Sequence, residues 1–183
     1  MPETDALEKT VFRAIQNLSH TDTVYFFGDL CAVNGWNPRV TIGDDETAAD
    51  LVATRTIPHP ESIAFANFDD GTPSSSYVDD LLQGITADRV TILVHEPPSR
   101  ELVDRAGDET FSFLGLGDLT AEVSRISVVE YLQKYFPEDS DTTERLGRFV
   151  TTVQTQTSEP AGRQSAERAT SAAEPDERGF NEG

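Results

Sequence analysis

Apolar residues recur along this chain with two different periods, one typical of helices and one typical of strands. Leu7, Val11, Ile15 and Leu18 follow a helical spacing, with charged residues largely on the other face. The pattern therefore predicts an amphipathic helix over Asp5–Leu18.

Several short runs are rich in β-branched and aromatic residues, which favour strands. Buried strands are predicted over Thr23–Phe27, Ser62–Phe68 and Arg89–His95. Shorter strands are predicted over Arg39–Ile42, Thr110–Leu114 and Glu122–Ile126.

Residues that cap helices stand before most of the remaining periodic segments. The helices predicted in this way run from Asp44 or Asp45 to Thr54, from Ser76 to Gly84, over Arg100–Ala106, from Ser127 to Phe136 and over Asp141–Gln154. Gly115–Asp118 is expected to be a turn.

Strands that alternate with helices indicate the α/β class. We expect a three-layer sandwich, in which helices cover both faces of a four- or five-stranded, mostly parallel sheet. This domain would occupy residues 1–154. Residues 155–183 contain only one large apolar residue, Phe180, and are expected to form a disordered polar tail.

The charge balance of the chain is strongly acidic. Its 33 acidic and 14 basic residues give a net charge of −19, and only Lys9 and Lys134 are lysines. Molar salt shortens the Debye length to about 3 Å and screens such repulsion. This composition is similar to that of haloarchaeal proteins, so we expect a halophilic protein.

The sequence also limits where the protein works and what it binds. The N-terminus does not resemble a signal peptide, and the apolar runs are too short to span a membrane, so we expect a cytoplasmic protein without a membrane partner. Because no window clusters basic residues, we expect no direct nucleic-acid binding through a basic face. A small molecule or a protein is the expected partner.

Polar residues follow three of the predicted strands, as Gly28-Asp29, Asp69-Asp70 and His95-Glu96. In open α/β sheets, ligands bind beyond the carboxyl ends of parallel strands. If the segments that end at residues 28, 68 and 95 run in parallel, these side chains share one edge. The predicted ligand-binding residues are Asp29, Trp36, Asp69, Asp70, His95 and Glu96.

The carboxylates among these residues suggest an alternative chemistry. Asp29, Asp69, Asp70 and Glu96 would supply oxygen ligands for Mg²⁺ or Mn²⁺, and His95 would carry a proton. A simpler interpretation needs no site. Acids occupy 33 of 183 positions, so acidic residues also follow strands by chance.

Other familiar chemistries find little support in the chain. It has no glycine-rich phosphate loop, and one cysteine with three scattered histidines does not form a zinc site. Cys31 follows a predicted strand, where a nucleophile assisted by His95 is one hypothesis. A lone cysteine between Leu30 and Ala32 is, however, typical of a buried apolar residue.

These observations leave three functional hypotheses open. The segment Asp79–Ala106 resembles α/β modules of haloarchaeal regulatory and sensor proteins, but this covers under a sixth of the chain and implies no residue roles. Because no catalytic set is recognisable, a non-catalytic regulatory module that uses no cofactor is the leading hypothesis. The alternative is a Mg²⁺- or Mn²⁺-dependent phosphoesterase or nuclease. A third possibility is an adaptor that acts through Asp141–Gln154 and the tail.

Overall fold

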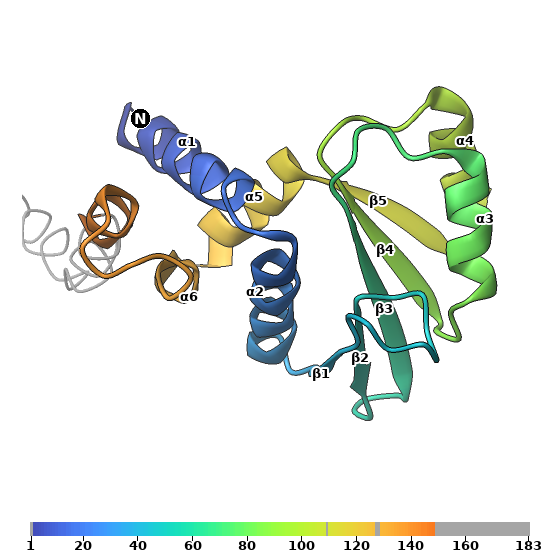
Figure 1. Ribbon diagram of the computed structural model, residues 1–183. Helices are drawn as coiled ribbons and strands as arrows, with labels where there is room; N and C mark the ends of the chain where they lie inside the picture. The colour runs from blue at the N-terminus through green and yellow to red at the C-terminus, as the bar shows by residue number, and fades with distance from the viewer. Residues whose placement is uncertain (1, 109, 127–128, 149–183) are drawn as a thin grey trace, which may run out of the picture.

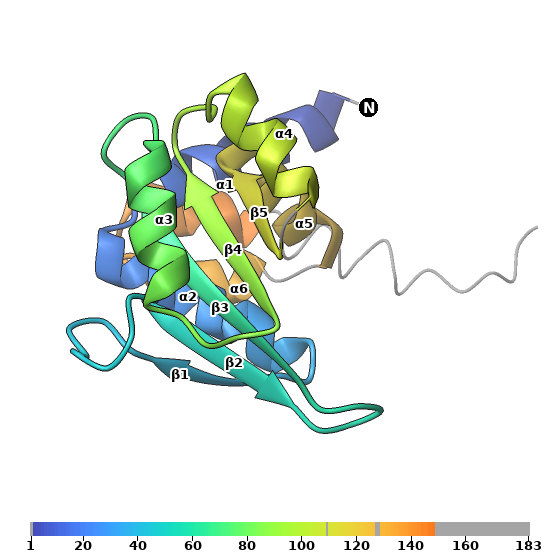
Figure 2. The same cartoon turned by 90° about the vertical axis from the view of Figure 1, so that its right-hand side faces the viewer.

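The computed structural model describes residues 2–108, 110–126 and 129–148, which form a five-stranded sheet with helices packed against it (Figure 1, Figure 2). The strands are β1 (Asn37–Val40), β2 (Leu51–Arg55), β3 (Glu61–Phe68), β4 (Arg89–Val94) and β5 (Phe111–Gly115). The helices are α1 (Pro2–Gln16), α2 (His20–Val33), α3 (Ser75–Gln83), α4 (Arg100–Asp108), α5 (Leu116–Ile126) and α6 (Val129–Gln133). Residues 141–148 are also helical.

The five strands lie in the sheet in chain order, and their directions divide it into two halves. β1, β2 and β3 are antiparallel neighbours, whereas β3, β4 and β5 are parallel. The α/β class is confirmed. The expectation of a mostly parallel sheet is wrong, because the first half of the sheet is a meander of antiparallel strands and only the second half has helical crossovers.

Apolar side chains on opposite faces of the sheet belong to two separate clusters. In β3, Phe65 packs into a cluster with residues of α1, α2, α5 and α6, while Ala64 and Ala66 face a cluster with residues of α3 and α4. Figure 1 shows these two groups of helices on opposite sides of the strands. Burial of a large side chain such as Phe65 contributes roughly 1.5–3 kcal/mol.

Residues 23–27 lie within α2, so the strand predicted there is wrong. The Ser19 side chain accepts a hydrogen bond from the backbone N–H of Asp22 and starts the helix. Val24 and Phe26 then become fully buried between the sheet and the other helices. A Cβ on Gly28 would lie 3.1 Å from the Leu51 side chain, so glycine lets the helix approach β2 closely.

The helix predicted from Asp44 or Asp45 to Thr54 is also wrong. Residues 44–50 form turns and bends, and Leu51–Arg55 is the second strand of the sheet. β2 hydrogen-bonds to strands on both sides, and Leu51 and Ala53 are fully buried. Pairing with two neighbours decides the conformation of this segment over its helical apolar spacing.

The region after β5 differs from the prediction as well. Leu116–Ile126 is a helix, where the sequence suggested a turn and an edge strand. The Asp118 side chain accepts a hydrogen bond from the backbone N–H of Gly115 at the start of this helix. Leu116, Leu119 and Val123 follow a helical spacing and pack into the cluster with α1 and α2.

The remaining elements agree with the sequence to within a few residues at their ends. The helix expected up to Phe136 is described only as Val129–Gln133, and the helix expected over Asp141–Gln154 is described up to residue 148. The predicted tail, residues 155–183, lies outside the described residues. Among the helices that the structure describes, none is long and apolar enough to cross a membrane.

Candidate functional site

The strand directions bring four chain segments to one edge of the sheet. β3, β4 and β5 all end there, since they are parallel. β2 is antiparallel to β3, so it begins at the same edge, next to Asp50. The expectation that chain segments after residues 68 and 95 share an edge is met. The segment at residue 28 does not end at this edge, because residue 28 lies in the middle of α2.

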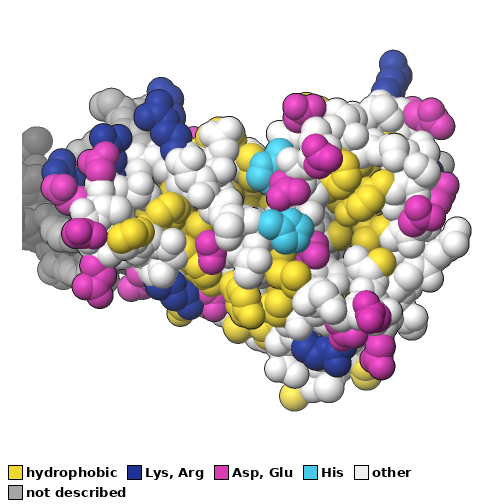
Figure 3. Space-filling model, in the orientation of Figure 1, with side chains coloured by type: hydrophobic (Ala, Val, Ile, Leu, Met, Phe, Trp, Pro, Cys, Tyr) yellow, Lys and Arg dark blue, Asp and Glu magenta, His cyan; other side chains and the backbone are white. Residues whose placement is uncertain are grey.

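A histidine at the start of α2 lies between two carboxylates at this edge. His20 Nε2 is 3.3 Å from Asp50 Oδ1, and His20 Nδ1 is 3.3 Å from Asp69 Oδ2. Asp50 precedes β2 and Asp69 follows β3. We call His20, Asp50, Asn67 and Asp69 the edge cluster. Figure 3 shows histidine side chains beside acidic side chains in the middle of one face of the molecule.

Asp50 is the most firmly held member of the edge cluster. Its backbone N–H donates to the carbonyl of Phe65 over 2.9 Å. Its Oδ2 accepts a hydrogen bond from the backbone N–H of Asn67 over 2.7 Å, while Oδ1 faces His20. The side chain is 21% exposed, against 47% for Asp69. Asp50 is therefore fixed by the sheet, and Asp69 is open to solvent.

Asn67 lies in β3 and is buried beside the histidine. Its Nδ2 is 3.3 Å from His20 Nδ1, and its Oδ1 is buried without a hydrogen-bond partner. A buried unpaired amide oxygen costs free energy in the absence of a ligand. Buried polar atoms without a partner are exceptions in proteins, and a bound water, ion or ligand is one explanation for them.

The partners of His20 depend on its protonation state. A neutral ring with its proton on Nε2 donates to Asp50 and accepts at Nδ1 from Asn67. A doubly protonated ring donates to Asp50 and Asp69 instead, because Nδ1 no longer accepts. The contacts within 3.3 Å thus provide a partner for each nitrogen in both states. This arrangement suits a side chain that takes up and releases a proton.

The two carboxylates of the edge cluster affect the pKa of Tyr77, which lies on α3. Burial and then the negative charges of Asp50 and Asp69 raise the pKa of Tyr77 to about 12. Its ring packs against Phe68, with the ring centroids 4.5 Å apart. Tyr77 therefore stays neutral at physiological pH and forms part of the wall behind the carboxylates.

The predicted ligand-binding residues divide into two groups in the structure. Asp69, Asp70, His95 and Glu96 follow β3 and β4 at the common edge, where Glu96 accepts a hydrogen bond from Thr72. His95 Nε2 is buried without a partner.

The second group lies elsewhere. Asp29 is on α2, where it accepts a hydrogen bond from Tyr135 over 2.6 Å and pairs with Lys134 over 2.7 Å. Trp36 stacks against Arg55, which ends β2 and therefore lies at the opposite edge of the sheet. The structure therefore does not bring Asp29 together with Asp69, Asp70 and Glu96, the other predicted metal ligands.

Cys31 is buried, and its burial raises the pKa of the thiol to about 11. A thiol with so high a pKa is a poor nucleophile at neutral pH. It belongs to the apolar cluster around α1 and α2, in agreement with its interpretation as a packing residue.

Sequence reasoning missed His20, Asp50 and Asn67. Two signals could have pointed to them. Ser19 and Asp22 form a capping pattern that makes His20 the first residue of a helix, and Leu51–Arg55 has the β-branched and apolar content of a strand that Asp50 precedes. Asn67 offers no such signal, because only the sheet places it beside His20.

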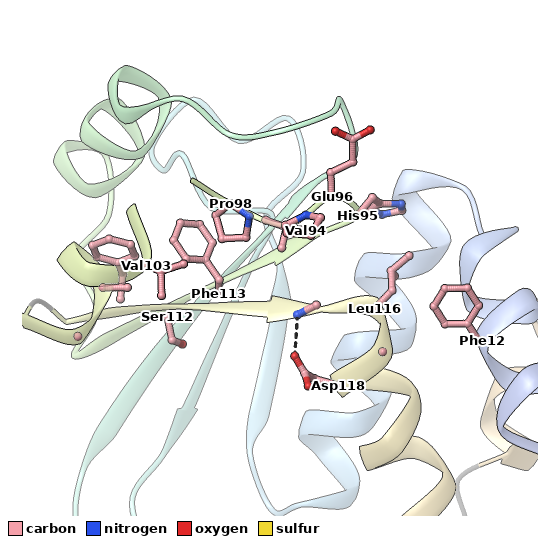
Figure 4. A pocket seen from close by; sticks show the side chains of 16 residues that line it. Phe12, Val94, His95, Glu96, Pro98, Val103, Ser112, Phe113, Leu116 and Asp118 are labelled. Carbon is pink, nitrogen blue, oxygen red and sulfur yellow. Dashed lines mark hydrogen bonds between the residues drawn. The ribbon is translucent and has the colours of Figure 1, made fainter. Parts of the chain in front are cut away.

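A pocket of about 610 Å³ lies next to the edge cluster, around the ends of β4 and β5 (Figure 4). Apolar and aromatic side chains from α1, α4 and β5 line it, together with His95 and Glu96. Its volume falls in the range of roughly 300–1,000 Å³ that is typical of small-ligand sites.

No protein-family model and no curated protein sequence matches this chain. Two solved structures are similar to it. The MspJI restriction endonuclease in complex with a 27-mer oligonucleotide matches with a TM-score of 0.42 and 9% identity, over 81% of this chain and 35% of that chain. The DNA modification-dependent restriction endonuclease AspBHI matches with a TM-score of 0.45 and 11% identity, over 85% of this chain and 41% of that chain.

These matches correct two expectations from the sequence. The leading hypothesis of a non-catalytic regulatory module rested on the lack of a recognisable catalytic set of residues, and direct binding of nucleic acid through a basic face was not expected. Both similar structures are endonucleases, and one holds an oligonucleotide, so neither expectation is kept. This chain spans well under half the length of either endonuclease, and so distant a likeness assigns no activity to it.

Proposed function

We propose that this chain is a phosphodiesterase of the nuclease kind, with its reactive centre at the edge cluster. The observation that supports this most directly is the position of His20 between Asp50 and Asp69, with the unpaired oxygen of Asn67 beside it. Hydrolysis of a phosphodiester needs a group that moves a proton and a site that tolerates the phosphate charge.

His20 moves the proton in this proposal. In its neutral state, with Nε2–H directed to Asp50, its Nδ1 accepts the proton of a water whose oxygen forms a bond to phosphorus, while the P–O bond to the leaving ester oxygen breaks and that oxygen takes a proton from solvent. Asp69 Oδ2, 3.3 Å from Nδ1, then accepts the new N–H and stabilises the imidazolium. Asp50 holds the ring in place from the other side throughout.

The two carboxylates also require a cation near the phosphate. Asp50 and Asp69 would repel a phosphate group in the absence of positive charge. Carboxylate and amide oxygens, the side-chain donors of Asp50, Asp69 and Asn67, are the kind that Mg²⁺ and Mn²⁺ prefer. These residues would hold the cation, which when bound offsets the phosphate charge and lowers the pKa of a coordinated water.

Mg²⁺ sites in proteins use few protein ligands. Mg²⁺ keeps several waters and is usually bound through one or two carboxylates. In the described part of the chain, no three His, Cys, Asp or Glu side chains are grouped as metal ligands. Because one or two carboxylates with waters are enough for Mg²⁺, a site at Asp50 or Asp69 would not need such a group.

Cleavage of end-labelled oligonucleotides in molar KCl tests the proposal, because the acidic composition predicts a protein adapted to high salt. We expect cleavage with Mn²⁺ or Mg²⁺ and none with EDTA. His20→Gln should lower the rate by about 10²–10⁴-fold, as loss of a general acid–base group does. Asp50→Asn, which keeps an oxygen for the Asn67 N–H, should lower it comparably.

Asp139→Asn is the matched control, because it removes one exposed carboxylate from a turn remote from the edge cluster in sequence. It should cleave at the rate of the unaltered protein. Cleavage that persists in the His20 and Asp50 variants, or that is missing in every preparation, would overturn the proposal.

A further inference from the structure

The pocket beside the edge cluster has walls suited to a flat apolar ring. Phe12, Pro98 and Phe113 contribute aromatic or ring-shaped surfaces, and Val103 lies at its rim with 51% of its surface exposed (Figure 4). A ligand in the pocket would cover this apolar surface. The walls therefore indicate an occupant with two apolar faces.

One buried polar atom of a residue that lines this pocket has no partner. His95 Nε2 is buried and makes no hydrogen bond, and His95 lines the pocket. A ring nitrogen of histidine donates or accepts a hydrogen bond according to its tautomer. An occupant with a polar edge, able to bond to Nε2, would satisfy it. A heteroaromatic ring combines this edge with apolar faces.

The pocket is one strand away from the edge cluster. Phe68 of β3 pairs with Val94 of β4, so Asp69 and His95 leave neighbouring strands at the same level. Adjacent strands lie about 4.8 Å apart. Glu96, at the pocket, accepts a hydrogen bond from Thr72 over 3.2 Å, which ties the pocket to the loop that follows Asp69.

The charge of the pocket argues against a phosphate as its occupant. Its described lining includes the acidic residues Glu96 and Asp118 and no lysine or arginine. The whole chain carries a net charge of −19. Attraction to phosphates, which also weakens steeply as salt rises, is therefore a poor source of affinity for nucleic acid here. Stacking of bases on aromatic side chains does not depend on positive charge.

We propose that this pocket takes an unpaired nucleobase of the substrate, and that the substrate class is single-stranded nucleic acid. The inference rests on the proposed function, since it places the base one strand away from the phosphodiester to be cleaved. A paired base in a duplex has its polar edge occupied by its partner and its faces covered by stacking, so it cannot enter.

Binding of an oligonucleotide that contains 2-aminopurine tests this without any cleavage, since it is measured with EDTA in molar KCl. Stacking in the pocket should change the fluorescence of the base. Val103→Asp replaces an apolar contact at the rim by a charge that repels the strand, and should weaken binding by about tenfold or more. Ile57→Asp adds the same charge at a site that is 83% exposed and not in the pocket, and should bind normally.

His95→Leu gives a second test that does not depend on the rim. Because it removes a buried atom without a partner, the melting temperature should stay the same or rise. Affinity for the oligonucleotide should fall by roughly two- to tenfold through the lost hydrogen bond. A merely structural role of His95 would instead lower the melting temperature and leave affinity unchanged.

The outcomes separate this inference from the proposed function. Equal binding of an abasic and a base-containing strand, preferred binding of blunt duplex, or normal affinity in both pocket variants would overturn the pocket assignment even if cleavage occurs. Binding that depends on the base, together with no cleavage under any metal condition, would support the pocket and overturn the nuclease assignment.

Discussion

Asp50 is a structural residue and a member of the edge cluster at the same time. One carboxylate oxygen accepts the backbone N–H of Asn67, and the other faces His20. Asp69 faces the same histidine but is about half exposed. The two carboxylates should therefore contribute differently to stability, although both belong to the proposed centre.

This difference is measurable by chemical denaturation in molar KCl. Asp50→Ala leaves the Asn67 N–H without its acceptor and should lower the free energy of unfolding by about 1–3 kcal/mol. Asp69→Ala should change it by less than about 0.5 kcal/mol, as is usual at exposed positions. Equal losses in the two variants would contradict the described hydrogen bonding.

Cys31 should make the stability of the protein depend on alkaline pH. Burial raises the pKa of its thiol from 9.0 to about 11. In the unfolded chain the thiol ionises first, so its contribution is fully present below pH 9 and is lost as the pH rises toward 11. The loss should amount to about 2 kcal/mol.

Unfolding curves at neutral pH and near pH 11 test this prediction. Cys31→Ala should reduce the loss of stability between the two conditions by about that amount. It should not abolish the loss, because burial also raises the pKa of Tyr77, and burial followed by the hydrogen bond to Asp29 raises that of Tyr135. An unchanged pH dependence in the variant would show that the thiol ionises in the folded protein.

At the residue scale, the sequence predicted one of the four residues of the edge cluster, Asp69. It placed Asp69, Asp70, His95 and Glu96 at one edge of the sheet because they follow strands whose apolar runs are unmistakable. His20 and Asp50 were not found, because each is defined by the start of an element that was assigned to the wrong class. Whether the predicted residues bind a ligand remains a prediction.

At the scale of elements, α2 shows why strong strand propensity can fail. Val24, Tyr25 and Phe26 favour a strand when taken alone. The Ser19 cap and the fit of Gly28 against Leu51 favour a helix, and burial of Phe26 stabilises this helix further. β3, β4 and α3 were predicted well, since propensity, spacing and capping all agree there.

The role of the cap leads to a direct prediction. Ser19→Ala removes the acceptor for the backbone N–H of Asp22 and should destabilise the protein by about 1 kcal/mol. Ser19→Asp keeps an acceptor at this position and should restore the stability. Thermal denaturation of the three proteins measures the effect. Equal stability of the alanine variant and the unaltered protein would show that packing alone determines the helix.

At the scale of the whole molecule, the net charge of −19 should dominate the response to salt. The Debye length falls from about 10 Å at 0.1 M to about 3 Å at 1 M salt, so screening becomes stronger and reduces repulsion among carboxylates. We expect the melting temperature to rise steeply between low and molar KCl. Sucrose at matched osmolality is the control, and an equal rise in sucrose would contradict a charge effect.

The most direct test of the edge cluster as a cation-dependent centre uses the three histidines of the chain, His20, His59 and His95. Their imidazole resonances can be followed by NMR while small amounts of Mn²⁺ are added in molar KCl. The account predicts that paramagnetic broadening affects His20 first and leaves His59 sharp, and that Asp50→Asn weakens this selectivity. Uniform broadening of the three histidines, or none at His20, would contradict it.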